Sequence, residues 1–181
     1  MEMVIVMKQR IMKQGLFGAN LLFLFLTSGC GEPKNTAIDP GAPALVIAGQ
    51  AIDGTVLSLK DYQGKVVLVD FWATWCGYCV KEIPEEKKLV TTYAGRPFAI
   101  LGVSGDDDRE ALRLFLEREQ LPWKSIFDAA GDIRSLWNIS GLPTYILIDH
   151  HGKVVRYWTG AGHMSEIKDS VADAVLAAER S

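Results

Sequence analysis

Two cysteines separated by two residues, Cys76 and Cys79, are the side chains of this sequence best suited to chemistry. They follow an apolar run that ends at Trp72, and the residues after them suit a helix. On the first turn of a helix, side chains three positions apart lie on one side, so the two sulfur atoms could join in a disulfide. The N-terminus of a helix favours negative charge and lowers the pKa of a thiol there. The pattern predicts Cys76 as the attacking thiolate and Cys79 as the thiol that resolves the mixed disulfide.

Other uses of a Cys-x-x-Cys pair are half of a zinc site, haem attachment and a purely structural disulfide. A tetrahedral zinc site is poorly supplied, because the sequence has no second cysteine pair and its three histidines are distant from this one. Haem attachment needs a histidine directly after the pair, where Val80 stands. A structural disulfide that closes so short a loop would restrain little of the unfolded chain. Redox chemistry is therefore favoured, with no bound metal and no cofactor.

The elements that must position the cysteines alternate between strand and helix patterns. Val66–Trp72 is an apolar run broken only by Asp70, which predicts a central strand buried on both faces. Further strands are predicted at 98–104, 123–127, 144–148 and 154–158, helices at 76–93, 109–120, 132–137 and 165–178, and a hairpin within 45–59. Pro84 lies inside the first helix and would kink it. This order predicts one mixed α/β domain over residues 44–181.

Residues 1–29 have the pattern of a secretory signal. Lys8, Arg10 and Lys13 precede an almost uncharged run that is shorter than the roughly 18–20 apolar residues of a membrane-spanning helix. The small residues before Cys30 resemble the lipobox of bacterial lipoproteins, which implies that Cys30 carries a lipid; an uncleaved signal anchor or a buried helix is the alternative. Residues 30–43 are rich in turn formers and predict a flexible tether. We therefore expect a protein of the bacterial cell envelope, outside the cytosol, anchored by a lipid or a signal anchor.

Composition excludes several other classes of protein. Nineteen Lys and Arg against 22 Asp and Glu give a net charge of −3, and no basic cluster stands out, which argues against nucleic-acid binding. Seventeen Gly and seven Pro rule out a collagen-like or Pro-rich chain. Three cysteines are too few for a small protein held together by disulfides. A length of 181 residues suits one domain with an extension.

The segment Val69-Asp70-Phe71-Trp72-Ala73-Thr74-Trp75-Cys76-Gly77-Tyr78-Cys79 resembles the active-site segment of the thioredoxin superfamily, and more closely that of the TlpA/ResA-like thiol–disulfide oxidoreductases. The pattern at 59–69, the loop Gly141-Leu142-Pro143-Thr144 and the turn Asp149-x-x-Gly152 resemble the same family. The resemblance covers residues 44–178. It implies a thioredoxin-like three-layer sandwich, in which helices flank a mixed central sheet, with an N-terminal β-hairpin and a central α/β insertion at 105–130.

The resemblance also implies roles for the loop before Pro143 and for residues beside the cysteines. Pro143 would follow a cis peptide bond and face the cysteine pair, and Leu142 beside it would offer backbone groups to a substrate; an ordinary trans proline is the alternative. Trp75, Gly77 and Tyr78 would contact substrate or tune the thiolate, although Trp75 could equally serve packing. Gly77-Tyr78 stands where thioredoxin has Gly-Pro, so the reduction potential of thioredoxin cannot be carried over to this chain.

Two acidic residues are candidates to accept the proton of Cys79. Asp70 matches the buried Asp of thioredoxins, and burial should raise its pKa; an acid that caps the strand at the surface is the alternative. Many TlpA/ResA-like members have Asn at the position of Asp70. Glu82 resembles a Glu that some relatives hold near the cysteines. Its alternative is the solvated helix face expected for Lys81, Glu85, Glu86, Lys87 and Lys88.

The resulting hypothesis is a disulfide reductase that acts on exported proteins and receives electrons from a membrane thiol–disulfide donor, working as a monomer. The oxidising direction uses the same residues. One alternative is a peroxiredoxin-like peroxidase, although the Pro-x-x-x-Thr-x-x-Cys pattern of that group is absent. Another is a copper carrier similar to Sco-like proteins, with His163 as third ligand, although those proteins have one more residue between their cysteines.

Overall fold

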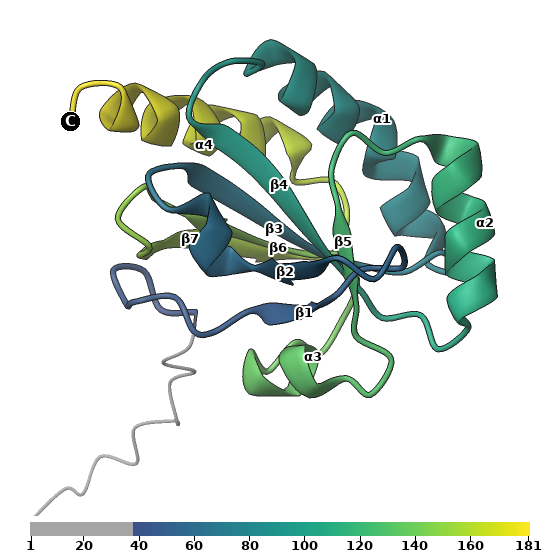
Figure 1. Cartoon of the computed structure of the whole chain (residues 1–181). Helices are drawn as coiled ribbons and strands as arrows, with labels where there is room; N and C mark the ends of the chain where they lie inside the picture. Colours follow the sequence, from purple (N-terminus) through teal and green to yellow (C-terminus); the bar gives the residue numbers. More distant parts are fainter. Residues whose placement is uncertain (1–37) are drawn as a thin grey trace, which may run out of the picture. The chain divides into compact units, whose positions relative to one another are not determined.

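The computed structural model describes residues 38–181. The predicted signal, Cys30 and the first part of the tether lie outside the described residues. In chain order the elements are β1 (Ala48–Gln50), β2 (Val56–Ser58), the short 3-10 helix η1 (Leu59–Tyr62), β3 (Val66–Trp72), α1 (Gly77–Thr92), β4 (Phe98–Ser104), α2 (Arg109–Glu119), β5 (Ser125–Phe127), α3 (Asp132–Leu136), β6 (Thr144–Ile148), β7 (Val154–Thr159) and α4 (Met164–Ala178) (Figure 1).

The central sheet has five strands in the order β5-β4-β3-β6-β7. β3 runs parallel to β4, and β4 to β5, whereas β6 pairs antiparallel with both β3 and β7. All seven residues of β3 are buried, because this strand lies in the middle of the sheet and both of its faces are covered. The buried central strand and the mixed sheet are confirmed.

The side chains of β3 alternate between two separate hydrophobic clusters. Val66, Leu68 and Trp72 pack with buried residues of α1, α2 and α4, whereas the alternating Val67, Val69 and Phe71 pack with residues of the β1–β2 hairpin and α3. In Figure 1, α1 and α4 accordingly lie on one side of the sheet, and α3 and the hairpin on the other. This three-layer thioredoxin-like arrangement is the predicted fold.

The alternation of β3 places Asp70 on the same face as Leu68 and Trp72, beneath the helices. The register pairs Asp70 with Tyr145 of β6 and with Gly102 of β4. Side chains directly opposite one another on paired strands point to the same face, so Asp70 and Tyr145 lie together under α1. Asp70 is buried there and does not cap the strand at the surface.

Several predicted elements differ in detail from the structure. The α1 helix begins at Gly77 and ends at Thr92 with Pro84 inside it, and the kink expected at Pro84 stays a prediction. The strand expected at 123–127 contains only Ser125–Phe127, at the edge of the sheet beside β4, so the predicted insertion supplies both α2 and an edge strand. None of the helices within residues 38–181 combines the length and apolar character needed to cross a bilayer.

Residues 38–43, part of the predicted tether, pack against the domain. Ile38 is buried in the cluster beneath the hairpin. The N–H of Gly41 donates to the carbonyl of Val154 at 2.7 Å, and the N–H of Val154 donates to the carbonyl of Ala42 at 2.9 Å. The boundary between tether and domain at residue 44 stays a prediction, and these bonds hold the preceding residues on β7.

Candidate active site

Cys76 and Cys79 form a disulfide at the start of α1, with an S–S distance of 2.06 Å and Cα atoms 5.3 Å apart. Cys76 is the N-cap residue of this helix, and its sulfur accepts a hydrogen bond from the N–H of Cys79 at 3.2 Å. The first turn holds no acidic residue. Unpaired N–H groups and the helix dipole at this position favour negative charge on the Cys76 sulfur.

The two cysteines differ in exposure. Cys76 is 7% exposed and Cys79 is 2% exposed, and the residues on either side of Cys76 lie at the surface. A large substrate can therefore reach Cys76 more easily than Cys79. This asymmetry agrees with the predicted order, in which Cys76 attacks and Cys79 resolves.

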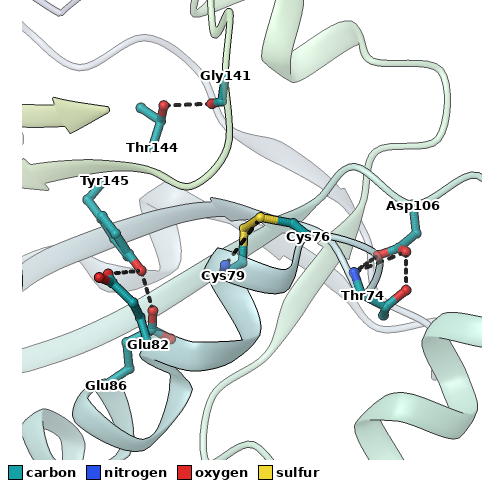
Figure 2. The surroundings of a disulfide bond; sticks show 9 residues. All are labelled: Thr74, Cys76, Cys79, Glu82, Glu86, Asp106, Gly141, Thr144 and Tyr145. Atoms are coloured by element: carbon teal, nitrogen blue, oxygen red, sulfur yellow. Dashed lines mark hydrogen bonds between the residues drawn. A yellow bond between two sulfur atoms is a disulfide. The ribbon is translucent and has the colours of Figure 1, made fainter. Parts of the chain in front are cut away.

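The loop just before the cysteines is fixed by Asp106, a buried residue that follows β4. Its carboxylate accepts hydrogen bonds from the N–H and the hydroxyl of Thr74, at 3.1 Å and 2.5 Å, and from the hydroxyl of Ser104 at 2.7 Å. Figure 2 shows Asp106 and Thr74 on the Cys76 side of the disulfide. The sequence placed Asp106 only in a turn before α2, so its part in holding the active-site loop was missed.

A cavity of about 380 Å³ lies beside the disulfide. Trp75, directly before Cys76, and Tyr78, two residues after it, line this cavity and are 65% and 66% exposed. The opposite wall is made by residues 139–142 and by Arg134 of α3, a residue that sequence reasoning did not single out. Large exposed aromatic side chains next to a reactive sulfur suit contact with a polypeptide.

The loop that forms this wall ends in a cis peptide bond between Leu142 and Pro143, as the family resemblance implies. The hydroxyl of Thr144 donates to the carbonyl of Gly141 at 2.8 Å, and the carbonyl of Pro143 accepts from the N–H of Gly160 at 2.8 Å. Leu142 is half-buried and lines the cavity. Within residues 38–181, its backbone N–H and carbonyl form no hydrogen bond, so both groups are free to bind a ligand chain.

Three carboxyl groups lie on the Cys79 side of the site, between α1 and the sheet. Asp70 is buried, and one of its oxygens has no hydrogen-bond partner. Burial raises the pKa of Asp70 well above its ordinary value, and the nearby Glu86 and Glu82 carboxyl groups raise it further. Asp70 therefore holds a proton at pH values where an exposed Asp has lost it.

Glu82 lies one helical turn after Cys79 on the buried side of α1. One of its oxygens accepts from the N–H of Gly162 at 2.7 Å, and the other from the hydroxyl of Tyr145 at 3.1 Å. Glu82 therefore lies on the buried side of α1, one turn from Cys79, and not on the solvated face of this helix. Figure 2 shows Glu82, Glu86 and Tyr145 gathered beside Cys79.

Glu86 is the residue that the sequence placed wrongly. It was expected on the solvated face of α1, but it is 1% exposed, and one of its carboxyl oxygens lies within hydrogen-bond distance of the Tyr145 hydroxyl oxygen, at 2.6 Å. It lies four residues after Glu82, so both face the sheet. Burial raises the pKa of Glu86 to about 7, against the opposing effect of the Tyr145 hydrogen bond. The only sequence signal was position: Cys79, Glu82 and Glu86 share one helical stripe.

Across the described part of the chain, no three His, Cys, Asp or Glu residues are placed to hold a metal ion together. His163, the third ligand of the copper hypothesis, is the N-cap residue of α4, and its ring lies 3.7 Å from the Glu166 carboxylate. The features described at the candidate site are the disulfide, the cavity and the carboxyl cluster.

Comparison with known proteins gives a consistent result. The model of the Redoxin family matches residues 38–176. The thiol-disulfide oxidoreductase ResA of Bacillus thuringiensis subsp. konkukian is 30% identical over 138 residues, which cover 76% of this chain and 79% of that relative. ResA of Geobacillus thermodenitrificans is 31% identical over 137 residues, which cover 76% and 78%. The thioredoxin domain of a thiol-disulfide oxidoreductase from Bacteroides vulgatus superposes with a TM-score of 0.68 at 32% identity, covering 75% of this chain and 97% of that domain.

Proposed function

Because this chain belongs to the Redoxin family and is a thiol–disulfide oxidoreductase, we propose that it works as a reductase of protein disulfides outside the cytosol, tethered to a membrane. The observation that carries the proposal is the position of the Cys76 sulfur. It caps α1, accepts the N–H of Cys79 and borders a cavity with exposed aromatic walls. A thiolate is stabilised there and can be approached by a chain.

The reaction proceeds in two exchanges. The Cys76 thiolate attacks one sulfur of the substrate disulfide, which forms a mixed disulfide and releases the other sulfur as a thiolate. A carboxylate then takes the proton of the Cys79 thiol. The Cys79 thiolate attacks the Cys76 sulfur, closes the disulfide and releases the second substrate thiolate. Two electrons have passed to the substrate, and a thiol–disulfide donor must return them.

Asp70 and Glu82 are the two carboxyl groups proposed to receive the Cys79 proton. Glu82 lies one turn along α1 from Cys79 and is held by two hydrogen bonds, which favours it as an oriented base. The raised pKa of Asp70 favours that group as a proton store. Asp70→Asn and Glu82→Gln would separate the role of proton store from that of base. Only loss of the base should slow the second exchange, in which Cys79 attacks the Cys76 sulfur.

Substrate binding is assigned to both sides of the cavity. Trp75, Gly77 and Tyr78 would contact the chain on the helix side, and Leu142 and Pro143 on the loop side. The free N–H and carbonyl of Leu142 support a short stretch of strand pairing with the substrate backbone. Recognition through the backbone suits an enzyme that must accept a disulfide in more than one sequence.

The membrane tether is proposed from the sequence of the N-terminal segment, with Cys30 as the lipidated residue and exported proteins as substrates. Cys30→Ala in the full chain, expressed in a bacterium, should move the protein out of the membrane fraction if a lipid on Cys30 is the anchor. Retention in the membrane fraction would instead indicate the uncleaved signal anchor.

The chemistry is tested by trapping. With Cys79→Ser, the mixed disulfide cannot be resolved, so a covalent adduct between Cys76 and a disulfide-bonded substrate peptide should accumulate and be seen by mass spectrometry. Cys76→Ser is the matched control and should give no adduct. Equal adduct with both variants would refute the assignment of Cys76.

The direction is tested by the reduction potential of the Cys76–Cys79 pair. A reductase should give a value near that of thioredoxin, roughly −270 mV, and a value near roughly −120 mV, that of a strong oxidant, would refute the reducing direction.

A further inference from the structure

One hydroxyl lies between two buried carboxyl groups in the described domain. The Tyr145 oxygen is 2.6 Å from an oxygen of Glu86 and 3.1 Å from an oxygen of Glu82 (Figure 2). All three side chains are buried, with Glu82 9% and Glu86 1% exposed. Tyr145 comes from β6 and the two glutamates from successive turns of α1, so the contact depends on packing between helix and sheet.

A tyrosine hydroxyl has a single hydrogen and can donate it to only one acceptor. Burial, followed by the nearby Asp70 carboxyl, raises the pKa of Tyr145 far above its ordinary value, so the hydroxyl keeps this hydrogen. If both glutamates were ionised, one carboxylate would face the lone pairs of the Tyr145 oxygen without a proton between them. Both contacts are satisfied when one glutamate is protonated and donates to the Tyr145 oxygen, while Tyr145 donates to the other.

The surroundings indicate which glutamate holds the proton. The second oxygen of Glu86 is buried without a partner, and its neighbours on α1 include the buried Ile83 and Leu89. Glu82 instead receives the N–H of Gly162 on its second oxygen at 2.7 Å. A backbone N–H stabilises a carboxylate, whereas an unpartnered oxygen in an apolar setting favours the neutral acid.

We propose that Glu86 and Tyr145 are positioning residues of the dithiol reaction. Glu86 holds the proton that the two glutamates share and donates it to the Tyr145 oxygen. Tyr145 in turn donates to Glu82, and this chain keeps Glu82 ionised and oriented to take the proton of Cys79. The inference rests on the proposed function, in which a carboxylate near Cys79 accepts that proton.

The other charged or titratable groups around the cluster are few. Asp70 of β3 faces it from the sheet, and the segment between β7 and α4 contributes the N–H of Gly162, followed by His163, whose ring lies 3.7 Å from the Glu166 carboxylate. On the outer side of α1, Glu85 is paired with Lys88 and with Lys168 of α4. None of the ion pairs in residues 38–181 includes Asp70, Glu82 or Glu86, so no cation neutralises the cluster and a proton must do so.

The test measures closing of the Cys76–Cys79 disulfide in the reduced full chain after mixing with a peptide that holds one disulfide. The rate is followed over about pH 4 to about 9, which spans ordinary carboxyl and thiol pKa values. In the wild type, the plot of closing rate against pH should contain a step near pH 7, where Glu86 ionises. Glu86→Gln keeps a donor to Tyr145 but cannot ionise, so this step should vanish. Glu85→Gln, a neighbour on the outer side of α1, should keep it.

Two further measurements complete the test. Tyr145→Phe removes the link between the glutamates and should slow closing by about tenfold, the effect of losing a hydrogen bond to a charged group. Infrared spectra near neutral pH should lose one carboxylic-acid C=O band in Glu86→Gln and none in Glu85→Gln. A step near pH 7 that persists in Glu86→Gln, an unchanged acid band, or full speed in Tyr145→Phe would each overturn the inference.

The outcome can be separated from failure of the proposed function. If Cys79→Ser traps no adduct with the peptide and the reduced wild type does not reduce the peptide disulfide, the reductase proposal fails, and the infrared comparison still decides where the proton lies. If trapping by Cys79→Ser succeeds while the profiles of wild type and Glu86→Gln coincide, the reductase proposal stands and the positioning role of Glu86 is refuted.

Discussion

Replacement of Glu86 by leucine should make the protein more stable at neutral and alkaline pH. Glu86 is buried on α1, on the same helix as the buried Ile83 and Leu89, and one of its carboxyl oxygens has no partner. Leucine has a similar size and needs no hydrogen bond, so Glu86→Leu removes a buried ionisable group. The Tyr145 hydroxyl keeps Glu82 as a partner at 3.1 Å.

The magnitude follows from the pKa of Glu86, which rises from 4.5 to about 7 in the folded protein. Because the folded state binds the proton more tightly, the wild type loses stability as the pH rises from 4.5 through 7. At about 1.4 kcal/mol per pH unit, this loss reaches about 3 kcal/mol. After subtraction of about 1 kcal/mol for the lost hydrogen bond, Glu86→Leu should gain about 2 kcal/mol at pH values above 7.

Urea unfolding of the oxidised chain over a series of pH values measures this effect. The wild-type free energy of unfolding should fall with rising pH, and the slope should be smaller in Glu86→Leu. Glu85→Leu is the matched control, since loss of its two partly exposed ion pairs, with Lys88 and Lys168, should change stability by less than about 1 kcal/mol. A variant that is less stable than wild type above pH 7, with an unchanged slope, would refute the assignment of a costly buried carboxyl group to Glu86.

Three other perturbations have expected outcomes. Asp106→Ala leaves the buried hydrogen-bond donors around Thr74 without an acceptor, so the free energy of unfolding should fall by about 3 kcal/mol and the alkylation rate of reduced Cys76 should change. Gly102→Ala would place a Cβ 2.0 Å from the Ser125 hydroxyl inside the sheet, and thermal unfolding should show a loss of about 1–3 kcal/mol. Trp75→Ala removes a side chain that is 65% exposed, so stability should stay within about 0.5 kcal/mol while the KM for a peptide disulfide rises.

Local patterns in the sequence predicted a mixed α/β domain and the reactive cysteine pair, and the family resemblance implied the thioredoxin-like arrangement of that domain. The apolar run at Val66–Trp72 had to be a buried central strand, and a Cys-x-x-Cys segment after it had to fall on the first turn of a helix. The cis bond before Pro143 was also anticipated, through the family resemblance of its loop.

The carboxyl cluster required the tertiary structure. Glu86 stands within a charged stretch of α1, and charged residues on a helix usually face water. Its burial depends on Tyr145, 59 residues away, whose hydroxyl meets it across the boundary between helix and sheet. No local periodicity distinguishes a glutamate that faces water from one that meets such a partner.

The same reason applies to the loop before Cys76. The sequence showed Asp106 as one of three consecutive acids in a turn, yet its carboxylate binds Thr74, 32 residues earlier. The sequence by itself therefore indicated the cysteine pair and the central strand that precedes it. The tertiary structure alone decided which polar groups are buried together around those atoms, because a buried carboxyl group is stable only beside donors or protons that distant segments bring to it.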